Sequence, residues 1–312
     1  LGDFRADNFD LHQGYLTFGD VGETSIDVRI GRQEMSLGGQ RLIGAVGWTQ
    51  QGRSFDGIRI SDSPKGGKVD FFLIRTGDDS SPAVANNAYF GGGYVTVPLD
   101  NVGGVDLYAL YNRVSGTANT ELYTLGARLS GSSGKLTCRA EGSYQAGESG
   151  ANDVSAFMVG GRLGFQLSDK TKLTLWGDLL SGDDDPTDGD TKVFNTLFAT
   201  NHKFYGFADL FLNVPLHTNG QGLVDFAVKL SLKPQKDVTL GIDLHSFRLS
   251  KKRALSSARL GEEVDVTFAY KYSKQASIVL GGAYVKQQDA LGAIDRLSDD
   301  MKWAYVTTNV AF

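Results

Sequence analysis

Arginines and carboxylates recur together between positions 32 and 59, and they are the residues of this chain best suited to chemistry. A guanidinium forms two parallel hydrogen bonds with a carboxylate, or it stays available to an anionic ligand. The spacing therefore leaves two roles open: a lattice of ion pairs that stiffens a wall, or a surface that binds anions. The residues are Arg32, Arg41, Arg53 and Arg59, with Glu34 and Asp56.

Patterns typical of catalysis or metal binding are weak by comparison. None of the four histidines lies in a recognisable nucleophile motif. The acidic loop GDDDPTDGD at 182–190 lacks the ligand spacing of a calcium loop. The single cysteine, Cys138, has no companion for an intrachain disulfide or a metal. We therefore expect no enzyme activity, no metal and no cofactor.

Composition and charge exclude two further classes of protein. The net charge is −5 and the pI is about 5.4, and Lys and Arg are mostly scattered singly, so we expect no nucleic-acid partner. The apolar stretches are far shorter than the roughly 20 residues of a membrane-spanning helix, which excludes a helical membrane protein. The 40 glycines, 18 phenylalanines and 12 tyrosines suit a sheet with tight turns and aromatic girdles.

Alternating apolar and polar residues recur along the whole chain, as expected for strands with one apolar and one polar face. In residues 224–232, for example, Val224, Phe226 and Val228 alternate with Asp225. These segments run to about 9 to 12 residues, which is longer than most soluble strands and matches a tilted membrane strand.

Short and long connections alternate between these segments, as in outer-membrane barrels, where the short turns are periplasmic. Short turns are predicted at 63–67, 100–104, 168–171, 234–237 and 273–276, and long loops near 38–53, 78–87, 183–222, 250–261 and 288–301. Strands are predicted near 8–19, 24–36, 54–62, 68–77, 88–98, 105–115, 120–130, 135–146, 154–167, 172–181, 223–233, 238–249, 262–273, 277–288 and 302–312.

Fifteen strands conflict with the even strand number that is usual for bacterial barrels. A further strand is therefore expected either upstream or within 190–215. The predicted fold class is all-β: a transmembrane antiparallel up-and-down β-barrel of about 14–16 strands, with short periplasmic turns and long extracellular loops. We expect one domain over residues 1–312, with the chain beginning after processing or within the domain.

The C-terminal segment KWAYVTTNVAF places Ala304, Val306 and Phe312 on one face of a final strand. An aromatic last residue on the lipid face is similar to the signal that the barrel-assembly machinery reads. Phe312 is therefore the candidate assembly signal, and that machinery and outer-membrane lipid are the expected partners.

Two stretches go beyond the general pattern of a barrel. Residues 31–60 read GRQEMSLGGQRLIGAVGWTQQGRSFDGIRI, and residues 194–211 read FNTLFATNHKFYGFADLF. Both closely resemble segments of the alginate-export family of outer-membrane channels. The resemblance implies passive passage of an anionic polysaccharide such as alginate, or of smaller anions, through a lumen lined with Arg and Lys. A general small-solute porin of the same family and a plugged barrel that serves as a scaffold remain alternatives.

Alternation gives the cations that would line such a lumen. Together with the first group, the pore-lining candidates are Arg32, Arg41, Arg53, Arg59, Arg139, Arg162, Lys229 and Lys271. Carboxylates face inward on the same pattern, so a lumen of mixed charge is expected: Glu141, Asp178, Asp225, Asp243, Glu263 and Asp265. Arg32 shares its face with Ile30 and so requires a bulge or a position near the rim. The 38–53 segment is a candidate constriction, and 183–222 is long enough to fold inward or to dock a partner.

Overall fold

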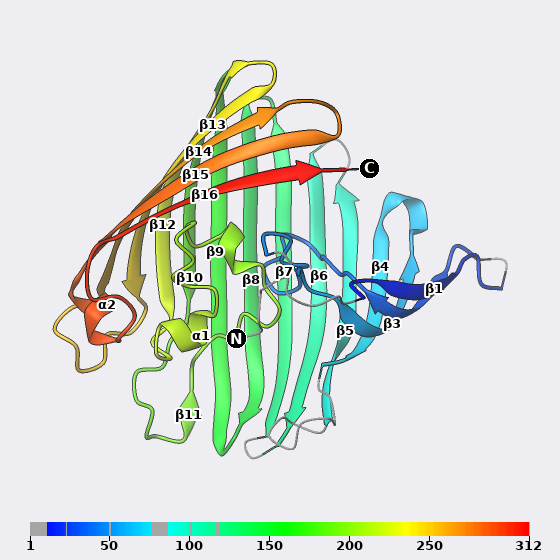
Figure 1. Cartoon of the computed structure of the whole chain (residues 1–312). Helices are drawn as coiled ribbons and strands as arrows, with labels where there is room; N and C mark the ends of the chain where they lie inside the picture. The colour runs from blue at the N-terminus through cyan, green and yellow to red at the C-terminus, as the bar shows by residue number, and fades with distance from the viewer. Residues whose placement is uncertain are drawn as a thin grey trace. The chain divides into compact units, whose positions relative to one another are not determined.

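The computed structural model describes residues 11–22, 24–49, 51–76, 87–99, 102–116 and 119–311. In this part of the chain sixteen strands form one sheet, and fifteen of them lie in sequence order in an up-and-down arrangement (Figure 1). The strands are β1 (Gly14–Phe18), β2 (Asp27–Gln33), β3 (Phe55–Asp62), β4 (Lys68–Arg75), β5 (Asn87–Leu99), β6 (Gly103–Ser115), β7 (Thr120–Ser133), β8 (Leu136–Ser149), β9 (Asn152–Ser168), β10 (Thr171–Leu180), β11 (Asp190–Thr191), β12 (Leu223–Gln235), β13 (Val238–Leu249), β14 (Arg259–Lys271), β15 (Ala276–Gln287) and β16 (Met301–Val310).

Each of the fifteen predicted strands corresponds to a strand of the sheet, which confirms the predicted fold class. The main differences concern length. β8 and β9 extend toward each other, so only Gly150 and Ala151 connect them, and Gly150 adopts the positive φ of +64° that this tight turn requires. The predicted loop 78–87 lies almost wholly outside the described residues.

The strand expected within 190–215 is present but short. β11 contains two residues and pairs in parallel with the start of β9, with Asp190 opposite Asp153. It is far shorter than the roughly 9 to 11 residues that a membrane strand needs. β11 therefore anchors the long connection to the sheet and does not add a crossing.

The contacts of the chain divide it into two compact units. Unit 1 contains residues 1–129, 141–157 and 185–200, and unit 2 contains residues 130–140, 158–184 and 201–312. The strands within each unit pair in antiparallel registers with few shifts; in unit 2, for example, β13 and β14 pair from Val238 opposite Tyr270 to Arg248 opposite Arg259, with one shift near that end.

Both units expose apolar residues on one face of the sheet and bury polar residues on the other, the reverse of a soluble protein. In unit 2, Phe226 and Val266 are 62% and 51% exposed, whereas Asp225 and Asp265 are 0% and 1% exposed. In unit 1, exposed Leu107 alternates with buried Asp106 in the same way. We call the apolar side the outer face and the polar side the inner face. The outer face suits the hydrocarbon of a bilayer.

Helices are few and short in the described residues: η1 (Pro64–Gly66), η2 (Asn201–Lys203), α1 (Val214–His217) and α2 (Asp289–Ala293). None of the helices in these residues has the length and apolar character needed to cross a membrane. Within unit 2, α2 lies at the end of the strands opposite the short β12–β13 and β14–β15 turns (Figure 1). The polar and aromatic residues around α1 cover inner-face positions of unit 2.

The lipid role of the outer face gives a first prediction. Val266→Lys places an ammonium near the middle of β14 on the outer face, and we expect it to lower the free energy of unfolding in lipid vesicles by about 2 to 4 kcal/mol. Thr267→Lys is the matched control, because its side chain lies on the inner face of the same strand. Urea titration followed by heat-modifiable gel mobility measures both variants. Equal destabilisation by the two substitutions would contradict the assignment of faces.

Candidate functional site

Residues 34–49 and 51–54, here called the first inner segment, pack against the inner face of unit 1. Arg41 is one of the most deeply buried side chains of the protein, and its Nε lies 3.6 Å from Oε2 of Glu141 on β8. Tyr108 donates a hydrogen bond of 3.3 Å to Oε1 of the same carboxylate. Arg41 thus holds the first inner segment on the sheet through a buried ion pair. Removal of either partner would leave an uncompensated buried charge, which is strongly destabilising.

A glycine allows the start of this segment to approach the sheet. Gly38 has a φ of +53°, and a Cβ at this position would lie 2.1 Å from the hydroxyl oxygen of Tyr94. Tyr94 donates a hydrogen bond of 2.9 Å to Asp106, whose carboxylate also pairs with Arg128 at 2.6 Å. The close approach therefore places the segment directly over a buried ion pair on the inner face.

Arg53 holds the end of the same segment without a carboxylate. Its guanidinium donates hydrogen bonds to the backbone carbonyls of Gly44, Phe198 and Ala199, and it lies over the Phe198 ring at 5.8 Å. Burial lowers the pKa of Arg53 to about 10, which leaves the group charged at neutral pH. Arg53 thus joins the first inner segment to residues 192–200. The two segments are also joined by a hydrogen bond of 2.9 Å that the Phe198 N–H donates to the Leu42 carbonyl.

Arg59 and Arg32 lie on opposite faces. Arg59 pairs with buried Asp70 at 2.8 Å on the inner face. Arg32 pairs with Asp56 at 2.8 Å, and the two side chains are 37% and 55% exposed. Alternation places this second pair on the outer face with Ile58, next to the end of β2, so Arg32 does not line the inner face.

In unit 2, three predicted cations gather around one aromatic ring. The guanidinium carbons of Arg139 and Arg162 lie 4.9 and 5.7 Å from the centroid of Trp176, and Nζ of Lys229 lies 5.2 Å from it. The indole N–H donates a hydrogen bond of 2.9 Å to Asp178. The aromatic face attracts all three cations and thereby holds them within one small region of the inner face.

Lys229 also belongs to a buried polar chain that the sequence only partly indicated. Its Nζ lies 2.7 Å from Asp243 and 3.0 Å from Nε2 of His245, and Nδ1 of His245 lies 3.0 Å from Asp225. The inward positions of Asp243 and Asp225 were predicted from alternation, whereas the contact of His245 with Asp225 joins different strands and has no local sequence signal.

Residues 201–222, here called the second inner segment, pack against the inner face of unit 2. Oε1 of Glu263 accepts a hydrogen bond of 2.7 Å from the Ala208 N–H, and Asp265 accepts one of 3.3 Å from the Phe207 N–H. Aromatic contacts add to these bonds, with Phe211 4.9 Å from Phe247. The segment therefore covers carboxylates that would otherwise face an open lumen.

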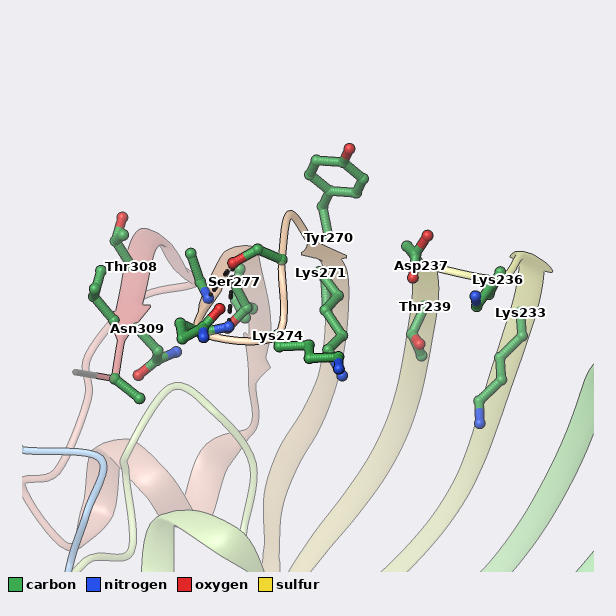
Figure 2. A pocket seen from close by; sticks show the side chains of 17 residues that line it. Lys233, Lys236, Asp237, Thr239, Tyr270, Lys271, Lys274, Ser277, Thr308 and Asn309 are labelled. Carbon is green, nitrogen blue, oxygen red and sulfur yellow. Dashed lines mark hydrogen bonds between the residues drawn. The ribbon is translucent and has the colours of Figure 1, made fainter.

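Two predicted residues remain. Lys271 ends β14 beside the β14–β15 turn (Figure 2). Alternation places it on the inner face, at the other end of the strand from Glu263. Phe312, the candidate assembly signal, lies outside the described residues, and β16 ends at Val310 before it.

A sheet with an apolar outer face and a charged inner face defines an outer-membrane β-barrel channel. Residues 3–304 match the family model described as alginate export, and the chain belongs to that family. The class and the family together locate the protein in the bacterial outer membrane. No curated protein matches the chain in sequence.

Solved structures from Pseudomonas aeruginosa are similar in fold. OccK10 (OpdN) has a TM-score of 0.61 at 11% identity, with 92% of this chain and 81% of that chain covered. OccK5 (OpdH) has a TM-score of 0.60 at 12% identity over 92% and 78% of the two chains. The outer membrane protein OprD has a TM-score of 0.60 at 14% identity over 91% and 75%. At these identities the likeness establishes the fold alone.

The contacts of Arg53 give a second prediction. Arg53→Gln removes the guanidinium that bridges the first inner segment to residues 192–200, and we expect faster hydrogen exchange at the Gly44 and Phe198 amides by about tenfold or more. Mass spectrometry of peptides from the folded protein measures the effect. Arg32→Gln, which removes an exposed pair on the outer face, is the control and is expected to leave these amides unchanged. Unchanged exchange in Arg53→Gln would show that the bridge does not hold the segment.

Proposed function

We propose that this outer-membrane channel passes anionic solutes, among them an acidic polysaccharide such as alginate. The observation that carries the proposal is the cluster of Arg139, Arg162 and Lys229 around Trp176 on the inner face of unit 2. Cations held together in a wall of low dielectric constant focus the electrostatic potential and raise the local concentration of anions.

Exposure distinguishes two of these cations from three of the carboxylates on the same face, whereas Arg139 is itself buried at 4% exposed. Arg162 is exposed and Lys229 is half-buried. Asp225, Glu263 and Asp265 are at most 1% exposed, and the last two accept hydrogen bonds from the second inner segment. A solute at the inner face of unit 2 would therefore meet Arg162 and Lys229 before these three carboxylates, although Asp243, which pairs with Lys229, is about as exposed as that lysine. This supports anions over cations as the solute.

A small-solute channel of the same family is the second candidate. In unit 1 the first inner segment and residues 192–200 cover part of the inner face, with Phe198 packed on Phe55 and Phe90. In unit 2 the second inner segment does the same. Segments that occupy inner-face surface leave less room for a polymer than for a single small anion. This observation favours small carboxylates over long chains.

Electrophysiology tests the proposal. In a planar bilayer with a salt gradient, we expect the refolded protein to give an anion-selective current that oligo-uronates block. Arg162→Gln is expected to reduce the anion selectivity and to weaken the block several-fold, because it removes the exposed cation of the cluster. Arg248→Gln, which removes an equal charge from the outer face of β13, is the matched control and is expected to behave as the unaltered protein.

Three other results of this recording would favour an alternative or contradict the proposal. A current without ion preference that ignores oligo-uronates would favour a general porin over the proposed anion channel. A folded, inserted protein that gives no current would support the scaffold alternative. Cation selectivity would contradict the argument from exposure.

A further inference from the structure

A lysine-rich pocket lies in unit 2 where the strands meet the short turns. It has a volume of about 620 Å³, within the range of ligand pockets, and β12 to β16 and their short turns line it (Figure 2). Four lysines contribute to its wall: Lys233, Lys236, Lys271 and Lys274. Among the described residues that line the pocket, Asp237 is the only one with a carboxylate side chain. The pocket is separate from the cation cluster at Trp176, and of its four lysines only Lys271 was among the pore-lining residues predicted from the sequence.

These lysines differ from the other cations of the inner face. Arg59, Arg128 and Lys229 each pair with a carboxylate at 2.6–2.8 Å. Among the residues that the structure describes, none of the four pocket lysines has an ion-pair or hydrogen-bond partner for its ammonium group. Four like charges around one concavity repel one another, and an anionic ligand would remove that cost.

Alternation places the pocket on the inner face and not among lipid headgroups. Figure 2 shows Tyr270 and Lys271 pointing in opposite directions from β14, and Tyr270 lies on the outer face with Phe268. Lys233 follows the same alternation on β12, two residues beyond inward-facing Ser231. Lys233 and Lys271 therefore belong to the aqueous side of the sheet, although Tyr270, which also lines the pocket, extends from the other face.

The remaining lining residues suit a sugar. Thr239, Ser277 and Asn309 offer hydroxyl and amide groups at the pocket, and Ala269 and Val279 offer small apolar surfaces. Lysine is a point charge that binds carboxylates without demanding the planar geometry of an arginine pair. Carboxylates together with hydroxyl-bearing rings are the chemistry of an acidic oligosaccharide.

We infer that this lysine pocket captures an acidic, carboxylate-bearing oligosaccharide at the periplasmic end of the channel. The short turns of an outer-membrane barrel are periplasmic, so the pocket meets solutes that approach from the periplasm. The inference rests on the proposed passage of anionic solutes, to which it adds a binding site and the side from which that site is reached.

Equilibrium binding measures the pocket without requiring conduction. The probe is tetragalacturonate, titrated by calorimetry into the refolded full chain in detergent at low salt. We expect Lys271→Gln combined with Lys274→Gln to weaken binding about tenfold, and added salt to weaken binding to the unaltered protein. The control is Lys135→Gln combined with Lys170→Gln, which removes equal charge from two other short turns of unit 2 and is expected to leave binding unchanged. Heat-modifiable mobility checks that both variants fold.

Chemical footprinting locates the ligand. Acetylation followed by mass spectrometry is expected to show that tetragalacturonate protects the four pocket lysines and leaves Lys135 and Lys170 reactive. Protection by vesicles of phosphatidylglycerol but not by tetragalacturonate would overturn the inference in favour of lipid contact. Equal affinity for inorganic polyphosphate of the same charge would overturn the assignment to a sugar.

The inference and the proposed function fail differently. If oligo-uronates block the current but bind equally to the pocket variant and the control, the pocket inference is wrong and the anion channel stands. If tetragalacturonate neither binds nor blocks, both are wrong. Binding that depends on the pocket lysines, in a protein whose current is not anion-selective, would support the pocket and contradict the selectivity of the channel.

Discussion

Every strand that crosses a bilayer must satisfy its backbone N–H and C=O groups within the protein, because the hydrocarbon offers no partner. This constraint explains the antiparallel registers of the sheet, and it also divides the side chains. Residues such as Phe226 and Val266 can face lipid, whereas their neighbours Asp225 and Asp265 must face inward. Because strand period alone makes this division, the inner face collects the buried charges of the strands, and each of them then needs a partner or water.

The loops supply many of those partners. Glu263 and Asp265 bond to backbone N–H groups of the second inner segment, and Glu141 pairs with Arg41 of the first. Arg53 differs from Arg41, because its partners are backbone carbonyls of the loops and not a carboxylate of the sheet. The inner segments are thus part of the electrostatics of the sheet, and their removal would leave buried charges without partners.

Strand positions could be predicted from the sequence because alternation is a local signal, and fifteen segments carried it over enough residues to be read. The partners of the charges could not be predicted, since Arg41 and Glu141 are a hundred residues apart. Alternation says only that Glu141 faces inward, and Arg41 lies in a loop to which alternation does not apply. Arg53 was harder still, because its partners are carbonyls, which every residue carries. The pocket lysines lie in separate strands and turns, so nothing in the sequence brings Lys233 and Lys271 together before the strand order is known.

The distribution of exposed charge along the inner face of unit 2 then gives the sequence of contacts for a solute. The pocket lysines lie where the strands meet the short turns, and Lys229 and Arg162 lie further along. The carboxylates beyond them are buried under the second inner segment. Under the proposed function, a mobile anion entering from the short turns would meet its strongest attraction at the pocket lysines and weaker, partly neutralised cations deeper in. Binding that is strong at entry and weaker further in allows a ligand to be captured and still released, as conduction requires.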